Sequence, residues 1–148
     1  MFNLKTPVKE VMTDTVISVE PMAIMTAVAD LFKTHHIHHI PVVERGKVIG
    51  MISTAELNRL EHHFSLFKSS QAKDVNAAIF SSLLAREVMT SQVVMIRETD
   101  TVQFAADIFK ENLFRALPVV NEDKDLVGIL TPYDLMVFAY RLDTPGLE

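Results

Sequence analysis

The sequence Gly128-Ile129-Leu130-Thr131-Pro132-Tyr133-Asp134 has the pattern of a strand that leads directly into a helix. The apolar run Leu126–Leu130 is typical of a strand, Thr131 is a good helix N-cap, and proline is tolerated at the first helical position. Asp134 then lies in the first turn, where backbone N–H groups and the helix dipole favour negative charge. Two interpretations are open: Thr131 and Asp134 only cap the helix, or they also hold the phosphate and sugar hydroxyls of a ligand.

The same pattern occurs a second time, at Gly50–Leu57, and is part of a longer internal repeat. Val11-Met12-Thr13 recurs at Val88-Met89-Thr90, and Pro41-Val42-Val43 recurs at Pro118-Val119-Val120, both with an offset of 77. After these prolines the offset becomes 78, because the following turn is one residue longer in the second copy. An insertion confined to a turn indicates a structural repeat, since chance matches would not keep register on both sides of it.

Within each copy, the apolar residues alternate between strand and helix periodicity. In the first copy the pattern predicts a strand at 16–19, a helix at 24–32, strands at 40–43 and 48–52, and a helix that opens at Ser53. In the second it predicts strands at 93–96, 116–120 and 126–130, a helix capped by Asp100, and a helix from Pro132 to about Tyr140. Each copy is therefore a strand–helix–strand–strand–helix unit. Two such units packed face to face would give an α/β (α+β) module with pseudo-twofold symmetry and one shared core.

We place the first repeat at residues 7–61, the second at 85–141, and a connection between them at 62–84. The connection contains no glycine or proline, which favours a helix over a flexible tether. Its three phenylalanines have two interpretations: they form exposed apolar surface for a second chain, or they cover the module's own core. These residues are Phe64, Phe67 and Phe80.

The composition argues against several functional classes. The net charge of −5 disfavours a nucleic-acid partner, since binding a phosphate backbone needs a basic face. The absence of cysteine removes disulfides, thiol catalysis and cysteine-based zinc sites, and it fits a reducing compartment. No apolar run approaches the roughly 20 residues that span a bilayer, and the N-terminal residues lack the apolar core of a signal peptide. We therefore expect a cytoplasmic protein without membrane insertion.

The duplicated order of Val-Met-Thr, Pro-Val-Val and Gly-x-x-Ser/Thr-x-x-Asp resembles the tandem domain pairs of the cystathionine β-synthase (CBS) family. The resemblance covers about residues 7–140, and its specificity lies in the duplicated order and spacing. It implies two β-α-β-β-α CBS repeats that form a stand-alone regulatory module. Such a module binds an adenosine-containing nucleotide (AMP, ADP or ATP) between the repeats and modulates a partner protein. The resemblance also implies a homodimer, no catalytic activity and no required cofactor.

The resemblance further implies which residues line the ligand site. Asp134 would bond the ribose hydroxyls, Thr131 would lie near the sugar and phosphate, and the other repeat would provide the adenine pocket. The residues implied for that pocket are Met12, Val16, Ile17, Ile37, His38 and His39. Arg115 is equivalent to His38, and both could face the cleft and meet phosphate, a task for which arginine is well shaped.

A second, weaker site is implied at the equivalent junction of the first repeat. Glu56 stands there in place of the family's usual aspartate, and its longer side chain would crowd a ribose while forming a good capping box with Ser53. We therefore expect the Asp134 site to be occupied in preference. The second site would combine Ser53 and Glu56 with Met89, Val93, Val94, Phe114, Arg115 and Ala116.

The histidine-rich run 35–39 suggests a metal site, since strand alternation would put His36 and His38 on one face. Two imidazoles hold a metal only with a further ligand, and no complete set is visible in the sequence, so we expect no metal site. An enzyme is also not expected: Asp134 and Glu56 occupy equivalent places rather than converging on one bond, and no catalytic motif is present.

One alternative function and several alternative ligands stay open. The alternative function is a ligand-free scaffold for dimerisation or partner docking. The alternative ligands are S-adenosylmethionine, a cyclic dinucleotide and NAD. The sequence does not identify the regulated partner.

Overall fold

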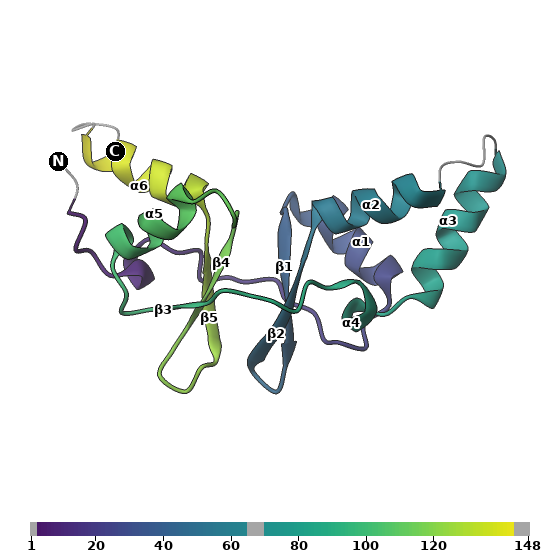
Figure 1. The fold of residues 1–148 in the computed structure, drawn as a ribbon, viewed down its shortest axis with the longest axis horizontal. Coiled ribbons are helices and arrows are strands. Elements are labelled where there is room, and N and C mark those ends of the chain that lie inside the picture. Colours follow the sequence, from purple (N-terminus) through teal and green to yellow (C-terminus); the bar gives the residue numbers. More distant parts are fainter. Residues whose placement is uncertain (1–2, 65–69, 144–148) are drawn as a thin grey trace. The chain divides into compact units, whose positions relative to one another are not determined.

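A computed structural model of the chain describes residues 3–64 and 70–143, with side chains described for residues 3–61 and 74–140. Both repeats form helices and strands in the predicted alternation, so the mixed helix and strand fold is confirmed (Figure 1). In chain order the elements are the 3₁₀ helix η1 (Val8–Glu10), α1 (Met25–His35), β1 (His39–Glu44), β2 (Lys47–Ser53), α2 (Thr54–Phe64), α3 (Ser70–Ser82), α4 (Ala85–Val88), β3 (Ile96–Arg97), α5 (Val102–Lys110), β4 (Leu117–Val120), β5 (Leu126–Leu130) and α6 (Pro132–Asp143).

The strands of the two repeats pair in the same way. In the first repeat, β1 and β2 form an antiparallel hairpin, and Val19 bridges to Val42 of β1 in parallel. In the second repeat, β4 and β5 form the hairpin, and β3 pairs with β4 in parallel, with Ile96 opposite Val119. Both residues of the second pair lie 77 positions after those of the first, so the strand register reproduces the sequence repeat.

The first strand of each repeat is shorter than the sequence predicted. The run 16–19 forms only the isolated bridge at Val19, and the run 93–96 becomes a strand only at Ile96. Strand structure requires a neighbouring strand as well as an apolar sequence. Only the last residue of each run reaches that neighbour, so the preceding residues stay irregular.

The N-terminus of α5 also differs from the prediction. Thr101, not Asp100, is the N-cap, because the Thr101 hydroxyl oxygen accepts a hydrogen bond from the Phe104 N–H at 3.1 Å. Asp100 instead accepts a bond from the backbone N–H of Arg97 at 2.7 Å. A carboxylate can satisfy a backbone donor in the preceding loop as well as one in the helix, and the sequence pattern does not distinguish the two.

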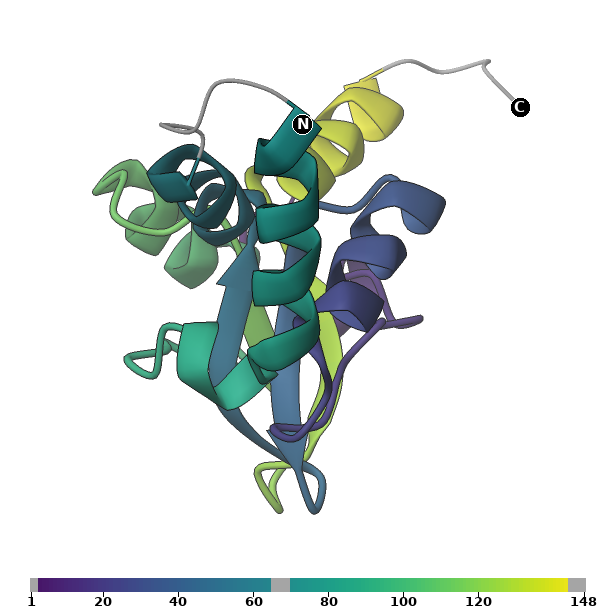
Figure 2. The ribbon, with the colours of Figure 1, turned by 90° about the vertical axis from the view of Figure 1, so that its right-hand side faces the viewer.

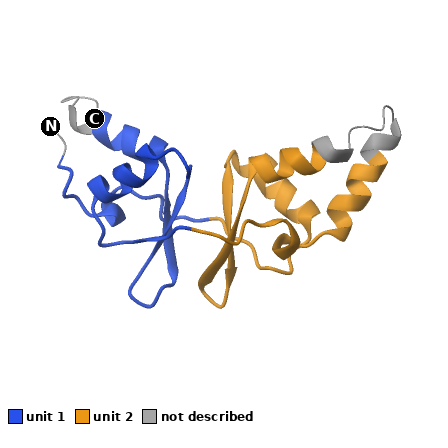
Figure 3. Cartoon of the chain, in the orientation of Figure 1, with its two compact units in different colours: residues 1–16, 94–148 blue, residues 17–93 orange. Residues whose placement is uncertain are grey.

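The chain divides into two compact units (Figure 3). Unit 1 contains residues 1–16 and 94–148, and unit 2 contains residues 17–93. These units do not coincide with the sequence repeats, because the first sixteen residues belong with the second repeat. The boundaries at 7–61, 62–84 and 85–141 describe the sequence repeats and stay predictions.

The leading segment of each repeat packs on the body of the other repeat. In unit 1, the Val8 N–H donates to the Asp100 carbonyl at 2.7 Å. In unit 2, the Ala85 N–H donates to the Ala23 carbonyl at 2.8 Å. Val8 and Ala85 are equivalent positions of the two repeats, and so are Ala23 and Asp100, since each pair is 77 residues apart. In both units, therefore, the donor comes from the leading segment of one repeat and the acceptor from the body of the other. The two repeats have therefore exchanged their leading segments.

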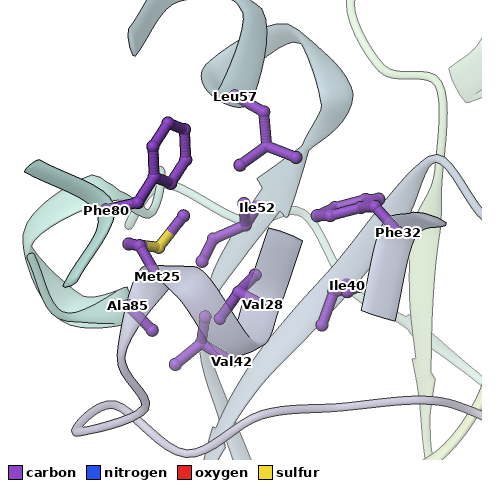
Figure 4. Close-up of a cluster of buried hydrophobic side chains, with 9 residues drawn as sticks. All are labelled: Met25, Val28, Phe32, Ile40, Val42, Ile52, Leu57, Phe80 and Ala85. Carbon is purple, nitrogen blue, oxygen red and sulfur yellow. The ribbon is translucent and has the colours of Figure 1, made fainter. Parts of the chain in front are cut away.

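Each unit encloses its own hydrophobic cluster, whereas the sequence led us to expect one shared core. The difference follows from the exchange, since each leading segment adds apolar side chains to the unit it joins. The cluster of unit 2 consists of Met25, Val28, Phe32, Ile40, Val42, Ile52, Leu57, Phe80 and Ala85 (Figure 4). The cluster of unit 1 consists of Val8, Ile96, Ala105, Leu117, Val119 and Leu130.

Helix α3 lies in the connection between the repeats and packs against α1 and α2 (Figure 2). Its Phe80 is 9% exposed and joins the core of unit 2, so the interpretation that Phe80 forms exposed surface is wrong. Phe64 and Phe67 lie outside the residues whose side chains are described. Among residues 3–64 and 70–143, no helix combines the length and the apolar character needed to cross a bilayer.

Candidate functional site

Reciprocal hydrogen bonds between Thr131 and Asp134 close the strand-to-helix junction of unit 1. The Thr131 N–H and hydroxyl donate to Asp134 Oδ2, at 2.9 and 3.0 Å. The Asp134 N–H donates to the Thr131 hydroxyl oxygen at 3.3 Å. This arrangement is a capping box with aspartate in the acidic position. Asp134 therefore has a structural role at the start of α6 whether or not a ligand binds.

Thr13 approaches the same carboxylate from the N-terminal segment. Its backbone pairs with Ile129 of β5 through two bonds of 2.9 Å, and its hydroxyl donates to Asp134 Oδ1 at 3.3 Å. Met12 lies so close to Gly128 that a Cβ atom at Gly128 would collide with the Met12 sulfur. The motif glycine thus provides the space that lets the N-terminal segment reach β5.

Unit 2 has the same junction with glutamate in the acidic position. The Ser53 N–H donates to Glu56 Oε2 at 2.7 Å, and the Ser53 hydroxyl donates to the same oxygen. The Thr90 hydroxyl donates to Glu56 Oε1 at 3.0 Å, as Thr13 does to Asp134. The Arg59 guanidinium donates to Oε1 as well, at 3.4 Å. The Glu56 carboxylate therefore accepts a hydrogen bond from Arg59, and among the described residues no equivalent donor reaches the Asp134 carboxylate.

These contacts set the ionisation of Glu56. Burial of the carboxyl group raises its pKa, but the hydrogen bonds from Ser53, from the Glu56 backbone and from Thr90 together hold the pKa below the ordinary value of 4.5. A carboxylate that accepts several hydrogen bonds is favoured over its protonated form. Glu56 is thus ionised throughout the physiological pH range.

The lowered pKa of Glu56 predicts an acid-dependent contribution to stability. Because the folded-state pKa lies below the unfolded-state value of 4.5, the contribution is present above about pH 4.5 and is lost as pH falls through the folded-state pKa. We expect wild type to be more stable than Glu56→Gln at pH 7, with the difference in stability shrinking only as the pH falls below about 4.5. Urea denaturation of both proteins from pH 7 to pH 3 measures it. A difference that stays constant over this range would contradict the prediction.

The predicted ligand residues divide between the two units. Met12 and Val16 lie in unit 1 with Thr131 and Asp134, and the exposed Arg115 also belongs to unit 1. The remaining residues predicted for the Asp134 site belong to unit 2, and their contribution stays a prediction. They are Ile17, Ile37, His38 and His39.

The second predicted site divides in the same way. Ser53, Glu56, Met89 and Val93 belong to unit 2, and Met89 lies against Gly50 as Met12 lies against Gly128. The other members belong to unit 1, where Ala116 is 8% exposed, so its side chain faces the interior. They are Val94, Phe114, Arg115 and Ala116.

Sequence reasoning missed Thr13 and Thr90, whose hydroxyls contact the two acidic side chains directly. The signal was present, because both threonines belong to the duplicated Val-Met-Thr motif. That motif was used to identify the repeat and to select its methionines. An exposed threonine duplicated at the same offset as the acidic residues could have been assigned to the junctions.

The histidine run does not have the geometry expected from strand alternation. His35 ends α1, His36 is its C-cap with φ 51°, and β1 begins only at His39. The expectation that His36 and His38 share a strand face is therefore wrong, because a left-handed residue terminates the helix before the strand starts. Within the described part of the chain, no three histidine or acidic side chains gather as a metal site would require.

Comparison with known sequences identifies two matching stretches. Residues 8–63 and 85–140 each match a family model described as the CBS domain. The CBS domain-containing protein YhcV of Bacillus subtilis is 29% identical over 139 residues, which cover 94% of this chain and 89% of that protein. A homoserine O-acetyltransferase of Methanocorpusculum labreanum is 29% identical over 125 residues, but the chain spans only 22% of its length.

Comparison with solved structures supports the same fold. CBSX2 from Arabidopsis thaliana superposes with a TM-score of 0.77 at 23% identity, covering 93% of this chain and 96% of that one. CBSX2 in complex with AMP gives a TM-score of 0.75 at 23% identity, with coverage of 93% and 98%. The CBS domain pair of protein MJ0100, in complex with 5-methylthioadenosine and S-adenosyl-L-methionine, gives 0.70 at 22% identity, with coverage of 92% and 98%. At these identities the likeness concerns the fold.

Proposed function

The chain belongs to the CBS-domain family, and on that premise we propose that it is a regulatory module that binds an adenosine-containing nucleotide and changes its contacts with a partner protein. The observation that carries the proposal is the junction at Asp134. There a carboxylate, two threonine hydroxyls and the first turn of α6 come together. A carboxylate suits paired sugar hydroxyls, and a helix N-terminus suits phosphate. The adenosine ligands bound by CBSX2 and MJ0100 support this choice of ligand class.

Under this proposal, the junction at Asp134 has one arrangement without ligand and another with ligand bound. Without ligand, Thr13 holds Asp134 Oδ1 through a single hydrogen bond of 3.3 Å, which is longer than a strong charge-assisted bond. A ribose diol would replace or share this bond, and the N-terminal segment that carries Thr13 would respond. A ligand shifts a conformational equilibrium only through its difference in affinity for the two states. The N-terminal segment is therefore the element through which ligand binding would be transmitted.

The remaining features belong to the same proposal. We propose that the module is a cytoplasmic homodimer that requires no cofactor and catalyses no reaction, and that its regulated partner is a protein. The contacts of Ile17, Ile37, His38, His39 and Arg115 with the ligand are proposed from the family resemblance, which leaves open which adenosine compound binds.

A second candidate function is a scaffold that binds no ligand. Asp134 already has a complete structural role as the capping partner of Thr131, which is what a ligand-free junction requires. The stripe Tyr133, Met136 and Tyr140 on α6 is apolar and between 48% and 70% exposed, a surface suited to a protein partner. Under this alternative, no adenosine ligand would stabilise the protein.

A thermal-shift panel distinguishes the two functions. We expect one or more of AMP, ADP, ATP, S-adenosylmethionine and NAD to stabilise the protein. At 100 times its dissociation constant, a ligand adds about 2.7 kcal/mol, which raises the melting temperature of a chain of this size by roughly 5–10 °C. We expect 2′-deoxy-AMP, which lacks one diol hydroxyl, to give a smaller shift than AMP. If no adenosine compound raises the melting temperature, the scaffold function is the correct one.

A further inference from the structure

The two junctions differ in how many acceptor positions of the carboxylate are already used. An ionised carboxylate has two oxygens and about four lone-pair sites. In unit 2, Glu56 Oε2 accepts both Ser53 donors, and Glu56 Oε1 accepts Thr90 and Arg59. All four sites of Glu56 are thus occupied by the protein itself.

Asp134 is less completely occupied. Its Oδ2 accepts both Thr131 donors, at 2.9 and 3.0 Å, but within the described residues its Oδ1 accepts only the Thr13 hydroxyl, at 3.3 Å. One site on Oδ1 is therefore open, and the second is held by a long, exchangeable bond. Two neighbouring hydroxyls of a sugar need two acceptor sites. At Asp134 Oδ1 they would displace only the Thr13 hydroxyl, whereas at Glu56 Oε1 they would have to displace both the Thr90 hydroxyl and the Arg59 guanidinium.

Arg59 is the residue that makes the difference. It lies three residues after Glu56, and the equivalent position after Asp134 is Val137, which has no donor. Arg59 is held over the carboxylate by a second contact, from its Nε to the Ala55 carbonyl at 3.4 Å.

We propose that Arg59 keeps the Glu56 carboxylate from binding a sugar diol, so that the chain takes one nucleotide, at Asp134. The proposal rests on the proposed function, since it assumes that an adenosine ligand binds through its ribose. It makes Arg59 a specificity-determining residue that turns two equivalent junctions into one ligand site and one internally satisfied site. The number of nucleotides bound per chain is thus set by Arg59 and Val137 together with the acidic residues.

The exposure of Arg59 makes the proposal testable. Its side chain is 75% exposed, and exposed ion pairs contribute little to folding stability. Arg59→Val, which reproduces the residue of the other repeat, should therefore fold normally. Arg86→Val is the matched control, because Arg86 is an exposed arginine of the same unit outside the junction.

Isothermal titration with AMP and with adenosine measures the number of sites. We expect one AMP per chain for wild type and for Arg86→Val, and two for Arg59→Val. We expect Val137→Arg to weaken binding at Asp134 by about 10-fold, the equivalent of one charged hydrogen bond. Adenosine carries no phosphate, so it separates the effect on the diol from attraction between arginine and phosphate.

Each outcome decides the inference. Two AMP molecules bound by wild type, or one AMP bound by wild type and still only one by Arg59→Val, would overturn the role of Arg59 while leaving the proposed function intact. Binding by Arg59→Val alone would support the role of Arg59 and overturn the assignment of the ligand to Asp134. No binding of either probe to any variant would overturn the proposed function, and the inference with it. If Val137→Arg fails to fold, Arg59→Val alone decides the question.

Discussion

Replacing Asp134 with alanine is expected to weaken AMP binding by about 100-fold or more, because two hydrogen bonds to a charged acceptor, each worth about 1.5–3 kcal/mol, are lost together. The substitution also removes the acidic partner of the capping box at α6, which should lower the free energy of unfolding by about 1 kcal/mol. Isothermal titration and urea denaturation of the same preparation separate the two effects.

Thr101→Ala is the control for Asp134→Ala. Thr101 caps α5 in the same unit through its bond from the Phe104 N–H. Its loss should destabilise unit 1 by a similar amount, about 1 kcal/mol, without changing AMP affinity. If Asp134→Ala binds AMP as tightly as wild type does, Asp134 is a helix cap only, and the proposed site is in the wrong place.

The second large effect concerns Val8, which is 0% exposed within the core of unit 1. We expect Val8→Asp to lower the free energy of unfolding by several kcal/mol, roughly 3–5, because an unpaired carboxylate would be buried among apolar side chains. The adjacent Lys9 is exposed, so Lys9→Asp places the same side chain next to this position in solvent and should cost less than about 1 kcal/mol.

The part of the chain that Val8→Asp destabilises tests whether the leading segments are exchanged between the repeats. Val8 lies at the start of the first repeat in sequence, but it belongs to the hydrophobic cluster that contains Leu117 and Val119 of β4 and Leu130 of β5, in the second repeat. Hydrogen exchange should therefore show protection lost mainly in β4 and β5, with β1 and β2 less affected. Faster exchange confined to β1 and β2 would mean that the segment packs on its own repeat.

Local sequence patterns predicted those helices and strands whose formation depends only on residues within or next to the element itself. β5 has the predicted bounds because Leu126–Leu130 is an unbroken apolar run between a turn and a capped helix. The capping bonds of Ser53 with Glu56 follow from residue types three positions apart. By contrast, the run 16–19 looked like a strand, but only Val19 found a partner, since pairing depends on the distant β1.

The candidate site shows the same division between local and distant information. Thr131 and Asp134 were identified from their own stretch, and the structure adds the bonds that join them. Thr13 was missed, because its contact with Asp134 spans 121 residues of sequence. Arg59 is also absent from the site residues that the sequence predicts. Its effect becomes visible only when the donors around Glu56 are compared with those around Asp134.

The amino-acid sequence alone determined that the chain is duplicated and that each copy contains a helix, a strand hairpin and a closing helix, because periodicity, caps and turn residues act over a few neighbouring positions and the repeat supplied them twice. Tertiary structure alone decided that the leading segments exchange, that each unit builds a separate core, and that the two equivalent carboxylates differ in their free acceptor sites. These outcomes depend on which distant groups can meet at van der Waals or hydrogen-bonding distance, and that is a property of the folded chain.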